Sequence, residues 1–465
     1  MILLAYETFV NDMFGILDAI YKAVPFVIAI VATLMICDKM KNVRKEDSVS
    51  VGYRKHASGI IFGLNDKKSV VFSPCDDEGH VAVFGGSGLG KTSALLIPTL
   101  RSWEGTSFTI DISGDICKNV DMPNKLVYAP SEADTTPYNI FYPIDQMKNE
   151  NDQNEALERL AFLFMPDDDK MSDTSRFFNT EGRKILTSSL IAFYHQGMDF
   201  IPICEKIVGS SWQDLFNDID ATGYDKAIRY INAFAGTSEQ NTAGCKQSVD
   251  AVLKLFATNE RVKRTIRRVK DSNELFFAPE KLEKYNVFVI IEDAKLELYA
   301  PLLHIITAQC LEHFAERSNK AETTILFSLD EFASFGRLEI TSALRKLRKK
   351  KIRIMTLTQS VPDIDLIYGK AERASMMNNY KFKVLLGAED PDTQDYFAKM
   401  IGYHDTKKYS VSKNAVSHTY TESDAKEWVI EPAKLARLNA EDSSLILICD
   451  GEYMRLRKNY YFKQN

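Results

Sequence analysis

The feature that most constrains this chain is a glycine-rich loop that directly follows a short apolar run. The run His80 to Phe84 (HVAVF) predicts a buried strand, and the loop after it reads GGSGLGKT. This word matches GxxxxGK(S/T), in which glycines let the backbone turn and present successive N–H groups to phosphate oxygens. We therefore predict a phosphate-binding loop made of Gly85, Gly86, Ser87, Gly88, Leu89, Gly90, Lys91 and Thr92.

The last two residues of this loop supply a charge and a metal ligand. Lys91 is placed to reach the β and γ phosphates of a nucleotide, and the Thr92 hydroxyl is suited to ligate Mg²⁺. A helix that starts here adds the positive end of its dipole. ATP and Mg²⁺ are therefore the predicted cofactors.

An acidic pair at a later strand end supplies the other half of a phosphoryl-transfer site. The run Thr323 to Leu329 (TTILFSL) predicts a buried strand that ends in Asp330 and Glu331. One carboxylate in such a pair supports Mg²⁺, and the other orients and deprotonates the attacking water. Two acids at a strand end are often only solvated. Because both halves of one site are present, we assign Asp330 to the metal and Glu331 to catalysis.

Short apolar runs predict an α/β fold with a mostly parallel sheet covered on both faces. Besides the two strands above, such runs occupy residues 107–112, 125–129, 286–292 and 351–357. The last run leads to Gln359, which we expect at the ligand-binding edge of the sheet, within reach of the γ-phosphate. A polar loop residue without a role is the alternative.

Residues 150–285 lack this strand pattern. Helical stretches are expected at residues 154–165, 177–196, 212–216, 224–234 and 247–256, with a loop at 236–244. We predict an all-α domain inserted into the α/β domain. The predicted divisions are 1–45 for a membrane anchor with a basic juxtamembrane segment, 46–150 and 286–465 for the two parts of the P-loop domain, and 151–285 for the helical insertion.

The N-terminal part contains an uncharged run at residues 23–37, followed by a basic cluster that includes Lys39 and Arg44. A bilayer span needs about 20 apolar residues, which is longer than this run, but Lys22 can snorkel to the interface. Basic residues hold their side in the cytoplasm. We therefore predict one transmembrane helix in the cell (inner) membrane, with the bulk of the chain in the cytoplasm. A buried or interfacial helix is the alternative.

Composition excludes several other classes of protein. The net charge of −6 argues against a wholly basic nucleic-acid binder but permits local basic patches. The seven cysteines show no CxxC pair or zinc-ligand spacing, so disulfides and structural zinc are not expected. Within the basic run 261–270, Arg264, Arg267, Arg268 and Lys270 would form a phosphate-contacting stripe at helical spacing. A solvated face is an equal alternative.

Several words of the sequence resemble the type IV secretion coupling proteins, the TraG/TraD class of conjugative ATPases. The resemblance covers about residues 50–465. It rests on the P-loop, SFTIDISGD, the pair Tyr138-Asn139, LDEFASFGR (329–337), TLTQS (356–360), Tyr368-Gly369, MIGYHDT (400–406), EPAKLARLNAEDSSLILICDG and Tyr460-Tyr461. The chain departs from that class at residues 113–115, where Ser-Gly-Asp replaces a lysine-glycine-glutamate word. It also shows one expected membrane span where members commonly have two.

The resemblance implies a homo-hexameric ring of RecA-like motor domains that delivers a relaxase-bound DNA strand to a type IV secretion channel. Lys91, Asp330, Glu331 and Gln359 match the nucleotide-loop, metal, water-activating and sensor residues of that class. Within the basic run 345–353, Arg348 matches an arginine that reaches the nucleotide of a neighbouring subunit. A solvated helix end is the alternative.

Two other functions stay open on the sequence alone. The same motor could move protein effectors or double-stranded DNA, because no residue pattern separates these cargoes. A non-catalytic receptor could bind ATP only to hold a ring together, although the complete set of Lys91, Thr92, Asp330 and Glu331 disfavours it.

Overall fold

The structure is a computed structural model that describes residues 50–52, 58–167, 171–271, 273–413 and 418–463. The chain divides into two compact units, residues 1–51 and 52–465, and the account below concerns the second. Strand β1 (Ser50–Gly52) lies at their boundary. The predicted membrane segment, residues 23–37, falls outside the described residues.

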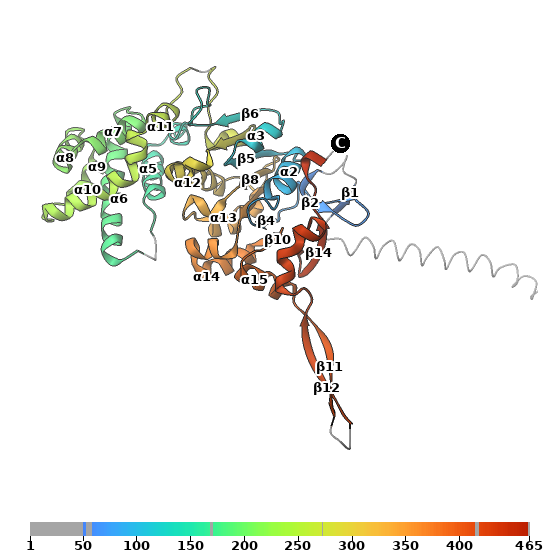
Figure 1. Cartoon of the computed structure of the whole chain (residues 1–465). Coiled ribbons are helices and arrows are strands. Elements are labelled where there is room, and N and C mark those ends of the chain that lie inside the picture. The colour runs from blue at the N-terminus through green and yellow to red at the C-terminus, as the bar shows by residue number, and fades with distance from the viewer. Residues whose placement is uncertain (1–49, 53–57, 168–170, 272, 414–417, 464–465) are drawn as a thin grey trace, which may run out of the picture. The chain divides into compact units, whose positions relative to one another are not determined.

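A large sheet forms the centre of the second unit, and its strands run in the order β3-β2-β14-β13-β10-β4-β9-β8-β5-β7-β6 (Figure 1). From β10 to β6 neighbouring strands pair in parallel, whereas β13, β14, β2 and β3 extend the sheet in antiparallel fashion. The strands are β2 (Gly59–Leu64), β3 (Val70–Pro74), β4 (His80–Phe84), β5 (Thr106–Asp111), β6 (Lys125–Tyr128), β7 (Asn286–Ile290), β8 (Ile325–Leu329), β9 (Ile352–Thr358), β10 (Tyr380–Leu385), β13 (Ser444–Cys449) and β14 (Glu452–Arg457).

The central parallel strands are apolar almost throughout because both faces of the sheet are covered. Every residue of β4, β5, β8 and β9 is buried. The predicted parallel strands are confirmed, with ends displaced by a residue or two, which is the usual uncertainty of element boundaries. The antiparallel strands were not predicted. The mostly exposed β14 lacks a covered apolar pattern, whereas β13 and β2 have buried apolar runs that were not assigned as strands.

Helices and turns flank this sheet. A π-helical turn (Lys91–Leu96) follows the P-loop and continues into α2 (Ile97–Arg101). The remaining helices are α3 (Asp115–Asn119), α4 (Tyr142–Asp145), α12 (Leu296–Ala315), α13 (Ile340–Lys346), α14 (Val361–Asn379), α15 (Pro391–Ile401) and α16 (Leu438–Asp442).

Between β6 and β7 the chain forms a group of helices that lies to one side of the sheet, and α5 and α10 of this group contact α12 (Figure 1). These helices are α5 (Glu150–Phe164), α6 (Asp173–His195), α7 (Phe200–Gly209), α8 (Trp212–Ala221), α9 (Asp225–Asn232), α10 (Glu239–Thr258) and α11 (Glu260–Thr265). The predicted helical character of this stretch is confirmed. The division of the chain into domains at residues 45, 150 and 285 stays a prediction.

One predicted loop in this stretch is wrong. Residues 239–244 belong to α10, whose N-cap Ser238 accepts a hydrogen bond from Asn241 N. The glycine that suggested a loop serves packing instead. A Cβ at Gly244 would lie 2.6 Å from Cε1 of Phe178, so only glycine permits this close approach of α10 to α6.

A long hairpin projects from the body of the molecule (Figure 1). Its strands β11 (Tyr403–Lys413) and β12 (His418–Trp428) pair with each other in a separate two-stranded sheet. At its base the rings of Tyr403 and Trp428 stack with centroids 4.2 Å apart. The sequence did not predict this hairpin, because its polar strands lack the apolar face that marks a sheet.

Candidate nucleotide-binding and hydrolysis site

The P-loop lies at the carboxyl end of β4, where the strand order places it beside the ends of β9 and β8. Gly88 and Gly90 have φ angles of 73° and 97°, in the left-handed region that glycine adopts without steric cost. The lysine is already turned into the loop. Lys91 Nζ donates to the Gly85 carbonyl at 2.8 Å and lies 3.5 Å from Glu331 Oε1. Its side chain is buried.

Two hard oxygen ligands meet at the proposed metal position. Thr92 Oγ1 donates to Asp330 Oδ2 at 3.4 Å, although the residues are 238 positions apart in the chain. Burial, reinforced by the neighbouring charge of Glu331, raises the pKa of Asp330 to about 7. A divalent cation on this carboxylate would favour its charged form, and hydroxyl and carboxylate oxygens are the ligands that Mg²⁺ prefers. The residues present therefore fit the predicted metal.

Glu331 occupies a strained position between the lysine and the glutamine. Its φ angle is 49°, which costs a residue with a side chain on the order of 1–3 kcal/mol. Its Oε2 accepts a hydrogen bond from Gln359 Nε2 at 3.3 Å. Its side chain is partly exposed at 26%, so water has access to it. A carboxylate that is accessible to water, held by a hydrogen bond and close to the P-loop lysine is suited to align and deprotonate an attacking water.

The structure thus brings five predicted residues together at one sheet edge, namely Lys91, Thr92, Asp330, Glu331 and Gln359. Their catalytic and metal-binding roles stay predictions.

Arg348 does not join them. It begins the short turn Arg348–Lys350 at the amino end of β9, and the seven residues of that strand span roughly 23 Å. Its side chain is 59% exposed and pairs with Glu78 at 3.5 Å.

Two side chains at the nucleotide edge were missed in the sequence. Asp111 ends β5 and is fully buried, where it accepts hydrogen bonds from Gly114 N and Cys117 N, each at 2.8 Å. It therefore fixes the turn formed by residues 113–115. The ring of Tyr460 lies against the P-loop, since a Cβ at Gly90 would be 3.1 Å from its Cε1. An acid at a strand end was a signal for Asp111, and Tyr460 was marked only as part of the Tyr460-Tyr461 pair of the family resemblance, without a role.

The helical spacing predicted for the basic run at residues 261–270 is wrong, because α11 ends at Thr265. Its arginines serve the fold instead. Arg264 donates to backbone carbonyls of the segment after β6, and Arg267 pairs with Glu274. Arg268 pairs with Asp145 at 2.9 Å and packs over the rings of Phe141 and Tyr194.

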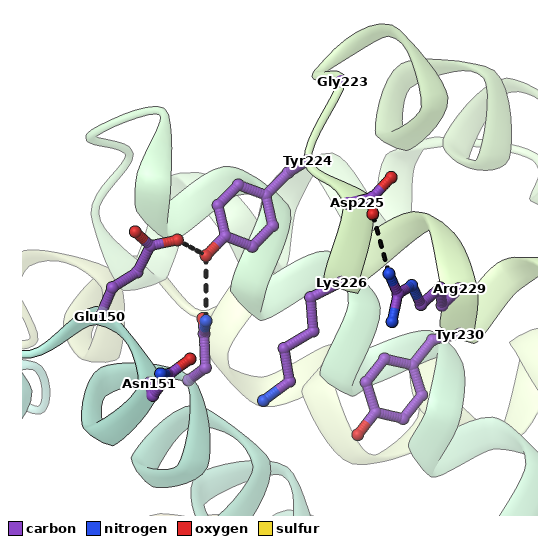
Figure 2. A pocket seen from close by; sticks show the side chains of 9 residues that line it. Glu150, Asn151, Gly223, Tyr224, Asp225, Lys226, Arg229 and Tyr230 are labelled. Atoms are coloured by element: carbon purple, nitrogen blue, oxygen red, sulfur yellow. Dashed lines mark hydrogen bonds and ion pairs between the residues drawn. The ribbon is translucent and has the colours of Figure 1, made fainter.

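A separate polar hollow of about 720 Å³ lies between α5 and α9 (Figure 2). The Tyr224 hydroxyl donates to Glu150 and accepts from Asn154 Nδ2 at 2.9 Å. Asn154 also bonds His195, whose ring stacks on Tyr224 with centroids 4.6 Å apart. Figure 2 shows the Tyr224 hydroxyl directed at Glu150, so this part of the wall bonds within itself. None of the nucleotide-edge residues lines this hollow.

Within the described ranges, no helix combines the length and the apolar character that crossing a bilayer requires.

Known proteins resemble this chain over most of its length. The family model described as "Type IV secretory system Conjugative DNA transfer" matches residues 38–465. Protein VirD4 of Rhizobium radiobacter is 24% identical over 404 residues, which are 83% of this chain and 57% of VirD4. A probable conjugal transfer protein TraG of Sinorhizobium fredii is 23% identical over 413 residues, which are 83% of this chain and 62% of that protein. The chain therefore spans little more than half the length of these relatives.

Solved structures show the same fold. The bacterial conjugative coupling protein TrwBdeltaN70 superposes with a TM-score of 0.67 at 19% identity, over 85% of this chain and 88% of that one. The coupling protein TrwB in complex with ADP and Mg²⁺ gives a TM-score of 0.67 at 18% identity, over 88% and 91% of the two chains. The predicted RecA-like α/β core is thus confirmed as a fold. Because the family model covers most of its residues, this chain belongs to the type IV secretory system conjugative DNA transfer family.

Proposed function

We propose that the chain is an ATPase that couples a DNA substrate, held by a relaxase, to a type IV secretion channel and drives its transfer. One observation carries this proposal: side chains from three separate parts of the sequence converge at the ends of β4, β8 and β9 as a complete phosphoryl-transfer set. The names of the similar proteins support the cargo, since they are conjugal transfer and coupling proteins.

Each residue of the set has one task. The P-loop backbone and Lys91 hold and neutralise the phosphates. Thr92 and Asp330 would hold Mg²⁺, which when bound would supply positive charge against the charge that develops on the phosphates. Glu331 takes the proton of the attacking water, and Gln359, hydrogen-bonded to Glu331, is placed to respond when the γ-phosphate leaves. The TrwB structure with ADP and Mg²⁺ supports both ligands for this fold.

The proposal includes an oligomer and a membrane anchor. Arg348 lies at the opposite edge of the sheet from Glu331, so it can serve hydrolysis only at the site of a second subunit. That arrangement is the one expected in a homo-hexameric ring. Residues 23–37 would anchor each subunit by a single span in the inner membrane, with residues 46–465 in the cytoplasm.

The test combines transfer and chemistry on the same variants. Lys91→Ala should abolish tight ATP binding and DNA transfer in a mating assay. Glu331→Gln should keep ATP binding but lose turnover by about 10²–10⁴-fold, because only the general base is removed. Fluorescent-nucleotide binding and phosphate release measure the two properties. Hydrolysis by Glu331→Gln at the wild-type rate would refute the catalytic assignment. Unimpaired mating with Lys91→Ala would refute ATP-driven transfer. Unimpaired mating with Glu331→Gln, which binds ATP without hydrolysing it, would favour the non-catalytic receptor.

The cargo needs its own discrimination. Transfer of a protein effector that stops with Lys91→Ala while DNA transfer continues would favour the motor for protein cargo. The reverse result supports DNA as the cargo.

A further inference from the structure

The chain that follows Glu331 makes a tight excursion before α13 begins at Ile340. Glu331 at its start has a φ angle of 49°, and Gly336 at its centre has one of 77°. Glycine takes such an angle freely, but glutamate does so only where its surroundings hold it. Within the loop, Ser334 N donates to the Glu331 carbonyl at 2.8 Å and Glu331 N donates to Asp330 Oδ1 at 3.1 Å. Contacts from outside the loop add to these two bonds.

The side chain of Tyr368 contacts this excursion near both of its ends. Its ring stacks on that of Phe332, the residue next to Glu331, with centroids 5.6 Å apart and planes 10° apart. Its hydroxyl oxygen accepts a hydrogen bond from Leu338 N at 3.1 Å. Phe332 and Tyr368 are 0% and 4% exposed, so the stack is a core contact rather than a surface one.

A second group of contacts fixes the tyrosine itself. The guanidinium of Arg337 lies 5.8 Å from the centre of the Tyr368 ring and pairs with Glu372 at 2.7 Å. Glu372 also accepts a hydrogen bond from the Thr341 hydroxyl at 3.0 Å. Directly after Tyr368, Gly369 has a φ angle of 77° and breaks α14. Tyr368 therefore ends the helical segment that begins at Val361, two residues after Gln359.

We infer that Tyr368 is a positioning residue for the carboxylate of Glu331. The inference rests on the proposed function, in which Glu331 activates the attacking water. The stack fixes Phe332 and the bond to Leu338 closes the excursion. Together they hold the left-handed backbone that directs Glu331 toward Lys91 and Gln359. Without the ring, the backbone at Glu331 relaxes to an ordinary angle, and the carboxylate leaves its position 3.5 Å from Lys91.

The effect on kinetics follows from what Tyr368 does not touch. Its ring and hydroxyl contact Phe332, Leu338 and Arg337 rather than the P-loop, so nucleotide affinity should not depend on it. Misplacing a catalytic group by about 1 Å can cost about 10²-fold in rate. The signature of positioning is therefore a lower kcat at an unchanged nucleotide Kd.

The experiment compares variants of the full-length chain by phosphate release and fluorescent-nucleotide binding. Tyr368→Leu should lower kcat by about 10²-fold while the nucleotide Kd changes less than about twofold. Tyr368→Phe keeps the stack and should lose about threefold or less. The matched control is Tyr128→Leu, which removes an equally buried tyrosine that bonds Thr265, and it should keep the wild-type kcat.

A double variant separates positioning from general loosening. In the Glu331→Gln background, Tyr368→Leu should cause no further loss of turnover, because the group it positions is already gone. Should Tyr368→Leu not fold, Phe332→Leu carries the same test from the other side of the stack.

The inference is overturned if Tyr368→Leu and Phe332→Leu keep the wild-type kcat, or if their losses multiply with that of Glu331→Gln. These results are distinct from failure of the proposed function, which would appear as normal hydrolysis by Glu331→Gln itself.

Discussion

The two ends of strand β9 differ in the hydrogen bonds and ion pairs that their side chains make within one molecule. At the carboxyl end, Gln359 contacts Glu331, which contacts Lys91, so the polar groups already bond one another. At the amino end, Arg348 is exposed and shares only a loose pair with Glu78 at 3.5 Å. Exposed pairs of this kind contribute about 0–1 kcal/mol. The residues at the first end already contact one another within one chain, whereas the proposed role of Arg348 at the second end requires another subunit.

The largest expected effect comes from Arg348 at the amino end of β9, and it tests whether that end acts on a second subunit. If Arg348 completes a neighbour's site, Arg348→Ala should bind nucleotide normally and lose about 10³–10⁵-fold in turnover, because a trans arginine neutralises charge on the departing phosphate. Turnover at saturating ATP and DNA measures it. Arg345→Ala and Lys349→Ala are controls of equal charge in the same run, and they should keep most of the activity. A loss of less than about threefold with Arg348→Ala would make the whole run a solvated face.

A smaller effect is expected from His80, whose ring bonds the backbone of β9 near its amino end. The Nδ1 of His80 accepts from Ile354 N at 3.0 Å, and its Nε2 lies 2.9 Å from the Leu344 carbonyl. Burial, with a smaller contribution from Arg353, lowers the pKa of His80 to about 4. The unfolded chain binds this proton near the ordinary pKa of about 6.5, so the stabilisation is complete above that pH and is lost as the pH falls toward 4.

Wild type should therefore lose about 3 kcal/mol of unfolding free energy from this group between pH 7.5 and pH 4. His80→Gln lacks the titrating ring and should not show this component. Denaturant unfolding of both proteins across that pH range measures the difference between them. Parallel curves for the two proteins would show that His80 is not held neutral.

The smallest expected effect concerns the helical region, far from either end of β9. Tyr224→Phe removes the hydroxyl that Glu150 and Asn154 share, and it should cost about 1 kcal/mol of stability. ATP turnover should stay at the wild-type level, because this polar hollow shares no residue with the nucleotide edge. A thermal melt and a phosphate-release assay decide the two points. A changed turnover would link the hollow to the motor.

The parallel half of the fold and most of the candidate site could be predicted from the sequence because their signals are local. The sequence GGSGLGKT predicts a phosphate-binding loop, and an apolar run that ends in two acidic residues predicts the end of a buried strand. Parallel strands with covered faces carry continuous apolar runs, so β4, β8 and β9 were found. The parallel arrangement then brings Thr92 to Asp330 across 238 positions of sequence.

The rest depends on contacts that no local pattern encodes. The hairpin β11–β12 has polar strands, and β14 exposes most of its residues. The helical stripe at residues 261–270 is absent because α11 ends at Thr265. Arg264, Arg267 and Arg268 instead bond to carbonyl or carboxylate groups elsewhere in the fold. The role of Gly244 depends on Phe178 in another helix, which turned a predicted loop into helix. Tyr368 was visible only as part of a family word, since its stack on Phe332 joins residues 36 positions apart.

The central claim is that the two ends of β9 serve one active site from two different subunits. Mixing two inactive full-length variants tests it most directly. Arg348→Ala has an intact base but no arginine to lend, and Glu331→Gln has an intact arginine but no base. If the claim holds, the mixture hydrolyses ATP faster than the sum of its parts, because the Glu331→Gln subunit lends its arginine to the Arg348→Ala site. A mixture no faster than that sum, across protein concentrations and with DNA present, would contradict it.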